Sequence, residues 1–345
     1  MKQDNSQLEE FRTFLLEKEL PEEKVASYLK GVRGFIQFLE DKNESIFSFT
    51  SGKLIEYADQ LVSRDKEAAV SLVLGLWNYF PYIGKYQYLE ELIDIAESAS
   101  AMGNLYKRIA DWHGEEIRDE IFKDIAIPPL GARPEKKPPV TREVMKRLEE
   151  KLGEEKTVEL LRPCLHGRPG DDSKDKETFL ELKDLDTFLT KKYQVLVKQV
   201  EKHRDEGTAM FAQLVDDEVV DYVKKVPTMG TGVREGNKII VSKIPYQMKR
   251  LLNTKDEQMK RYYLCYCPWI RGAIKDGTEK EISSNFCYCS GGFFKLYWDK
   301  IFDQSVEVEP LKTALWGDLV CKFAIEIPEE IMKEYTQEQP PKKEL

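Results

Sequence analysis

A proline-rich segment, IPPLGARPEKKPP (127–139), divides this sequence more sharply than any other feature. Five of its thirteen residues are proline. Proline fixes φ and lacks the amide hydrogen that a helix interior or a central strand requires. The segment is therefore predicted to be an extended connector or a strap across the surface, with a folded part on each side.

The region before this segment has helical periodicity and no strand alternation. Ser6 and Glu9 have the spacing of a capping box, and Pro21 stands where a second helix begins. The most apolar stretch, EAAVSLVLGLWNYFPYIG, ends at Pro81 and Gly84. These patterns predict an all-helical bundle over residues 1–100, followed by a helix and the proline-rich connector over 101–140.

Residues 141–335 are predicted to form a cysteine-rich α+β domain. Thr141 is expected to cap one helix, and a second, long helix is expected over 176–205. After Gly207, GVREGNKIIVSKIP predicts a hairpin around a Glu-Gly-Asn turn. RYYLCYCPWI has strand composition, and SGGFFKLYWDKIF predicts a helix capped by Ser290.

The end of the chain completes this prediction. VEVEPLKTALWGDLVCKFAIEIP predicts two strands around a Gly317-Asp318 turn. The expected fold class is therefore α+β: an N-terminal helical bundle, a helical connector and an antiparallel-sheet domain. The polar tail, 336–345, is predicted to be disordered.

Composition limits the classes of function. The 345 residues carry a formal charge of −9 and a mean hydropathy of −0.52. This charge gives no overall attraction to nucleic acid or to anionic lipid. The N-terminal residues are acidic where a signal peptide would be apolar, and no apolar run has the length of a membrane span. We therefore expect a cytoplasmic protein with no membrane partner, in which clustered cysteines are not structural disulfides.

Two Cys-Tyr-Cys triplets contain four of the six cysteines: Cys265, Cys267, Cys287 and Cys289. In a strand, residues i and i+2 point to the same face, so each triplet would present two neighbouring sulfurs. Four thiolates at tetrahedral distances would suit zinc or an iron–sulfur centre. The nearby aromatic residues also suit a second interpretation, in which these cysteines pack as small hydrophobic residues in a core.

Three further residues extend this metal-site hypothesis. The segment RPCLHG places Cys164 and His166 two residues apart, and Cys321 lies in a predicted strand. All three are candidate additional ligands, and a Cys-His pair is also a candidate nucleophile and base. The number of sulfur ligands distinguishes two kinds of site. Four sulfurs close a zinc site, which is then structural or transfers electrons, whereas two or three sulfurs with His166 are expected to leave room for chemistry or sensing.

The segments YYLCYCPWIRGAI, RPCLHG and the Gly317-Asp318, Cys321, Phe323 ending resemble an uncharacterised bacterial and archaeal family. That family is related to L-2-amino-thiazoline-4-carboxylate hydrolase-like proteins and, more distantly, to 4-vinyl reductase-type ligand-sensing domains. The resemblance covers roughly residues 105–330. It implies a small α+β domain with a pocket and clustered cysteines, and it transfers no catalytic residue.

The N-terminal 80 or so residues resemble the helical, SAM-like core-binding domain of phage-type integrases. In that family the module clamps DNA. Here residues 1–100 contain 11 Lys or Arg against 18 Asp or Glu, a balance that disfavours nucleic acid as a partner.

The leading functional hypothesis is a binding or sensor protein whose cysteine-rich domain holds a metal centre or a small-molecule ligand. One alternative is a thiol- or metal-dependent hydrolase of a small heterocyclic amide or amidine, which would lose turnover on Cys→Ser substitution. A second alternative is DNA binding through the helical module, which would require a salt-dependent affinity.

Overall fold

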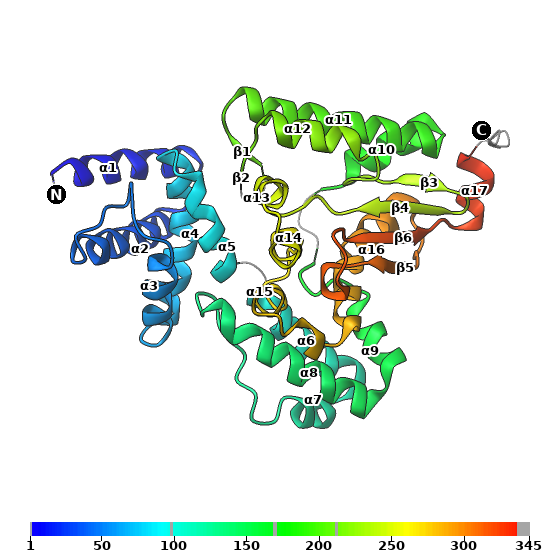
Figure 1. Ribbon diagram of the computed structural model, residues 1–345, viewed down its shortest axis with the longest axis horizontal. Coiled ribbons are helices and arrows are strands. Elements are labelled where there is room, and N and C mark those ends of the chain that lie inside the picture. The colour runs from blue at the N-terminus through cyan, green and yellow to red at the C-terminus, as the bar shows by residue number, and fades with distance from the viewer. Residues whose placement is uncertain (1, 97–98, 168–170, 211–212, 337–345) are drawn as a thin grey trace.

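The computed structural model describes residues 2–96, 99–167, 171–210 and 213–336 (Figure 1). It has the predicted α+β class, with a helical N-terminal region and small antiparallel sheets in the C-terminal half. Apart from Thr336, the predicted disordered tail lies outside the described residues. Within the described ranges, no helix combines the length and apolar character needed to cross a membrane.

The N-terminal helices form a bundle with its own core. They are α1 (Lys2–Glu17), α2 (Glu22–Glu40), α3 (Lys53–Val62), α4 (Lys66–Tyr82) and α5 (Leu89–Ala96). The buried residues of this core run from Leu8 to Ile95. The predicted capping box is wrong, because α1 already begins at Lys2 and the Ser6 hydroxyl donates to the Glu10 carboxylate instead.

The proline-rich segment is attached to this bundle. Leu130 packs against the bundle core, and the amide of Gly131 donates to the carbonyl of Ile95 at 3.0 Å. Arg133 and Lys136 both form ion pairs with Asp59 of α3, at 3.1 and 2.7 Å. The segment therefore binds the bundle surface as a strap.

Helix α8 (Lys137–Leu152) begins inside the proline-rich segment and not after it. Prolines are tolerated there because the first turn of a helix needs no amide hydrogen. Thr141 is consequently not a helix cap. It is buried within α8, and its hydroxyl donates to the carbonyl of Trp269 at 2.8 Å.

Several more helices precede the sheet. They are α6 (Ala99–His113), α7 (Glu115–Ile121), α9 (Glu154–Leu161), α10 (Ser173–Leu182), α11 (Leu185–Asp205) and α12 (Asp217–Lys225). The helix expected over 176–205 is two helices, because Lys183 ends α10 with a left-handed φ of 50° and Asp184 caps α11.

The C-terminal sheet contains the strands β3 (Val233–Glu235), β4 (Lys238–Ser242), β6 (Lys322–Glu326) and β5 (Val308–Lys312), in that order and all antiparallel. The hairpin predicted around Glu-Gly-Asn is confirmed as β3 and β4. The pair predicted around Gly317-Asp318 is confirmed as β5 and β6. A separate two-stranded sheet joins β1 (Ala209–Met210) to β2 (Gln213–Leu214).

Helix α16 (Tyr288–Phe302) packs on this sheet, with the rings of Phe294 and Phe323 5.4 Å apart. The other helices of this half are α13 (Met248–Asn253), α14 (Glu257–Leu264), α15 (Arg271–Asp276) and α17 (Glu329–Tyr335). Figure 1 shows α13, α14 and α15 between the N-terminal bundle and the sheet.

Both cysteine triplets differ from their predicted local structure. RYYLCYCPWI forms the end of α14 and the turn after it, and not a strand, because the Asp256 carboxylate accepts from the Met259 amide and starts a helix there. The predicted Ser290 cap is also wrong. A short 3-10 helix, η4 (Ser284–Cys287), leads directly into α16, so the second triplet lies where the two meet.

A buried polar cluster joins the bundle to the C-terminal domain. The Arg271 guanidinium, 2% exposed, lies 2.8 Å from the Asp94 carboxylate of α5. It also lies over the ring of Tyr262, whose hydroxyl donates to Asp94 at 3.2 Å. Lys137 donates to the Asp94 carbonyl at 2.7 Å. These contacts fix α5 against α14 and α15.

Candidate metal centre

Three predicted ligand residues meet in the C-terminal domain, where the buried core reaches the surface. The ligand atoms of Cys164, His166 and Cys289 all lie within 4.8 Å of one another. The Nδ1 atom of His166 is 3.6 Å from the Cys164 sulfur and 3.7 Å from the Cys289 sulfur. Both cysteines are buried, whereas His166 is exposed, so the group is open to solvent on the histidine side.

Helix α6 holds the segment that carries Cys164. Nη1 of Arg108 donates to the carbonyls of Leu160 and Pro163, at 2.5 and 2.6 Å. Nδ2 of Asn104, one turn earlier, donates to the Leu165 carbonyl at 2.7 Å. Because residues i and i+4 share a helix face, one face of α6 fixes the backbone on both sides of Cys164.

Helix α16 brings Cys289 to this segment through a close backbone contact at Gly292. A Cβ at position 292 would lie 2.1 Å from the Arg162 carbonyl oxygen and 2.4 Å from the Cys164 nitrogen. Only glycine permits this approach without a shift of the backbone. The Leu165 amide then donates to the Cys289 sulfur at 3.3 Å.

The two sulfurs differ in their protonation. A hydrogen bond from the Cys289 thiol, aided by His166, lowers the pKa of Cys164 from 9.0 to about 4 against the opposing effect of burial. The same hydrogen bond, together with burial, raises the pKa of Cys289 well above its usual value. At neutral pH the pair therefore shares a single proton, which stays on Cys289.

The remaining cysteines have a different environment. Burial raises the pKa of Cys265 and Cys287, and it raises the pKa of Cys267 and Cys321 to about 12. All four are therefore neutral thiols at physiological pH. This is the behaviour expected of cysteines that pack as small hydrophobic residues.

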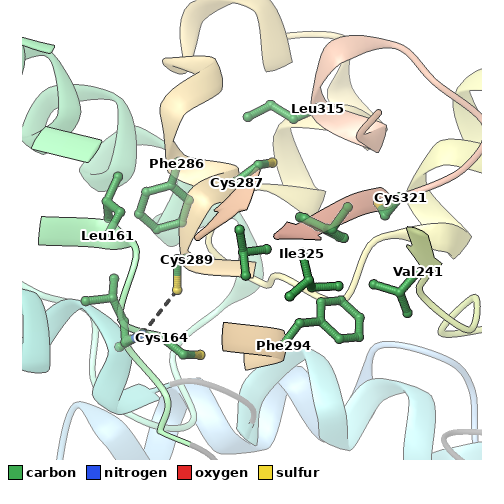
Figure 2. Close-up of a cluster of buried hydrophobic side chains, with 14 of the residues drawn as sticks. Leu161, Cys164, Val241, Phe286, Cys287, Cys289, Phe294, Leu315, Cys321 and Ile325 are labelled. Carbon is green, nitrogen blue, oxygen red and sulfur yellow. Dashed lines mark hydrogen bonds between the residues drawn. The ribbon is translucent and has the colours of Figure 1, made fainter. Parts of the chain in front are cut away.

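The structure does not gather the four triplet sulfurs into one ligand group. Across the described parts of the chain, Cys265, Cys267, Cys287 and Cys321 lie outside any set of three or more ligand atoms within 4.8 Å. In Figure 2, Cys287 points towards Leu315, whereas Cys289 points towards Cys164. In a helix, residues i and i+2 are about 200° apart, so the second triplet cannot present its two sulfurs to one point.

The spacing of the Cys164, His166 and Cys289 group suits zinc. Tetrahedral zinc with Zn–S of about 2.3 Å and Zn–N of about 2.1 Å places sulfur and nitrogen ligands about 3.6 Å apart. The two observed distances from Nδ1 to sulfur are 3.6 and 3.7 Å. Two sulfurs and one imidazole are also a ligand set that zinc uses in sites with an open fourth position.

Two residues of this site were not predicted from the sequence. Arg108 lies in a helical segment of mixed charge, and nothing in its neighbours indicates contact with the Cys164 segment. Gly292 gave a signal, because a glycine inside a helical pattern often marks close backbone approach. The partner of that approach became visible only in the tertiary structure.

Comparisons with known proteins add no assignment. No family model matches the chain, and neither the curated proteins nor the solved structures contain a match.

Proposed function

We propose that this chain is a metal-dependent binding or sensor protein in which Cys164, His166 and Cys289 hold one zinc ion. The observation that carries the proposal is the spacing of the His166 nitrogen from the two sulfurs, 3.6 and 3.7 Å, which is the nitrogen–sulfur spacing around tetrahedral zinc, with all three ligand atoms within 4.8 Å of one another. Three protein ligands leave the fourth position for a small molecule, and the exposed His166 lies on the side from which it would enter.

The electrostatics of the site favour a cation. Cys164 is a thiolate at neutral pH, and a divalent ion would displace the remaining proton from Cys289. Arg108 is placed to hold the site in its empty and filled forms, since its donors bind backbone carbonyls and leave the sulfurs free. Such a preformed site needs little rearrangement to bind the ion.

An open position would equally admit a substrate, so hydrolysis of a small heterocyclic amide or amidine is the second candidate function. The two functions differ in turnover. A sensor binds such a compound unchanged, whereas a hydrolase converts it and stops doing so when Cys164 or Cys289 is replaced.

Metal content tests the proposal. Elemental analysis of protein purified without oxygen should find about one zinc per chain. Cys289→Ser should lose it, with a drop in affinity of more than about 100-fold in a chelator competition. Cys287→Ser is the matched control, because that buried thiol lies two residues away and should leave zinc binding unchanged.

The same pair of variants separates the two metal-site hypotheses. A four-cysteine site made of both triplets predicts loss of zinc in Cys287→Ser as well. A folded wild-type protein that neither contains zinc nor takes it up would overturn the proposal. Cobalt(II) absorption supplies a second readout, since thiolate ligation gives charge-transfer bands that Cys164→Ser and Cys289→Ser should each weaken.

A further inference from the structure

The two sulfurs of the candidate metal centre are also placed for oxidation. Cys164 and Cys289 are both free and buried, and their sulfurs lie within 4.8 Å of each other. The Nδ1 atom of His166 lies beside both sulfurs, at 3.6 and 3.7 Å. The two residues come from segments far apart in the sequence, so the fold has brought the pair together.

The surrounding backbone is fixed on both sides of the pair. The Gly292 contact holds α16 against residues 162–164, and Arg108 holds the carbonyls around Cys164. A disulfide needs the sulfurs at about 2.05 Å, an approach that side-chain rotation can supply where the backbones already lie close. The rigid contact therefore holds these two cysteines where a bond between them can form.

The two cysteines also differ in access. Both sulfurs lie beside the exposed His166, at 3.6 and 3.7 Å from its Nδ1, but Cys164 is 6% exposed whereas Cys289, in the first turn of α16, is 3% exposed. Of the two residues near the histidine side, Cys164 is therefore the more exposed to a small oxidant.

We propose that Cys164 and Cys289 are an oxidisable dithiol pair that a hydroperoxide converts into a disulfide. The Cys164 thiolate attacks one peroxide oxygen, the O–O bond breaks, and a sulfenic acid forms at Cys164. The hydroxide that leaves takes a proton from solvent and becomes water. Cys289 then attacks the Cys164 sulfur, the S–O bond breaks, and the second hydroxide takes the Cys289 proton to form another water.

The balance of this reaction is complete. One thiolate, one thiol, one hydrogen peroxide and one proton give a disulfide and two waters. The two sulfurs lose two electrons and the peroxide gains them. Because the same sulfurs are the proposed zinc ligands, oxidation would also release the metal, but the disulfide itself needs no metal.

The test uses full-length, chelator-treated protein whose fold is checked by circular dichroism. After hydrogen peroxide treatment and blocking of free thiols, peptide mapping should find the Cys164 peptide joined to the Cys289 peptide, with the loss of two hydrogen atoms. Cys287→Ser should form the same disulfide. In Cys289→Ser, Cys164 should gain oxygen instead, since its sulfenic acid has no partner.

Two results would overturn the proposal: no disulfide in the folded wild-type protein, or one that joins other cysteines. The wild-type result is decisive even if a variant misfolds. Because metal-free protein is used, failure of zinc binding does not affect this test. Zinc binding without disulfide formation would refute the oxidation proposal alone.

Discussion

Replacement of Gly292 by alanine tests how the site is built. A Cβ at this position would lie 2.1 Å from the Arg162 carbonyl oxygen, 2.4 Å from the Cys164 nitrogen and 2.9 Å from the Cys164 Cα. Ordinary contacts of a Cβ begin at 3.4 Å, so the Arg162 carbonyl must retreat from α16 by about 1.3 Å and the Cys164 nitrogen by about 1.0 Å. All three atoms belong to the backbone, so no side-chain rotation relieves the clash.

Gly291→Ala is the matched control for this experiment. Its Cβ would meet only side chains, Val308 at 3.3 Å and Phe323 at 3.4 Å. Both variants gain about 1 kcal/mol of helix propensity, so that term cancels between them. Overpacking should leave Gly292→Ala about 1–3 kcal/mol less stable than Gly291→Ala in urea unfolding.

The same displacement should weaken the metal site. A shift of about 1 Å between ligands is enough to spoil a preorganised constellation. We therefore expect weaker zinc binding in Gly292→Ala than in Gly291→Ala, measured by competition with a chelating indicator. Equal stability and equal zinc affinity in the two variants would refute the argument that this glycine contact positions Cys164.

Two further predictions concern charge. Asp94→Ala should lower the free energy of unfolding by about 3–5 kcal/mol, because it leaves the buried Arg271 guanidinium without its carboxylate partner. A loss below about 1 kcal/mol, measured by urea unfolding, would contradict this prediction. In metal-free protein, the ultraviolet absorbance of the Cys164 thiolate should persist at neutral pH and be lost only as the pH falls toward about 4. Because this folded pKa lies below the unfolded value of 9.0, ionisation of Cys164 contributes stability that is fully present above pH 9.0 and declines as the pH falls through about 4. Cys164→Ser should remove both the absorbance and this pH dependence. If either persists in that variant, it arises from a group other than Cys164.

The C-terminal strands show what local sequence can predict. The Glu-Gly-Asn and Gly317-Asp318 turns predict their hairpins because such turns impose the backbone geometry that antiparallel pairing needs. The N-terminal helices follow from apolar residues at helical spacing in the same way. Each of these signals lies within a few residues of the element that it predicts.

The cysteine triplets show where local sequence misleads. Their aromatic and cysteine content is typical of strands, yet the helix cap at Asp256 and the packing of α16 on the sheet give helical structure around both. The change from strand to helix alters which neighbours share a face. It therefore separates Cys287 from Cys289 and turns Cys289 towards Cys164.

The sequence by itself determined the α+β class, the helical N-terminal bundle, the two hairpins and the residue types that could bind a metal. Which of those residues meet was decided by the tertiary structure. Cys289 reaches Cys164 and His166 because Gly292 lets α16 lie against the backbone of residues 162–164, while Arg108 holds that backbone from α6. Such contacts join residues distant in the chain, and their energy depends on packing that no local pattern encodes.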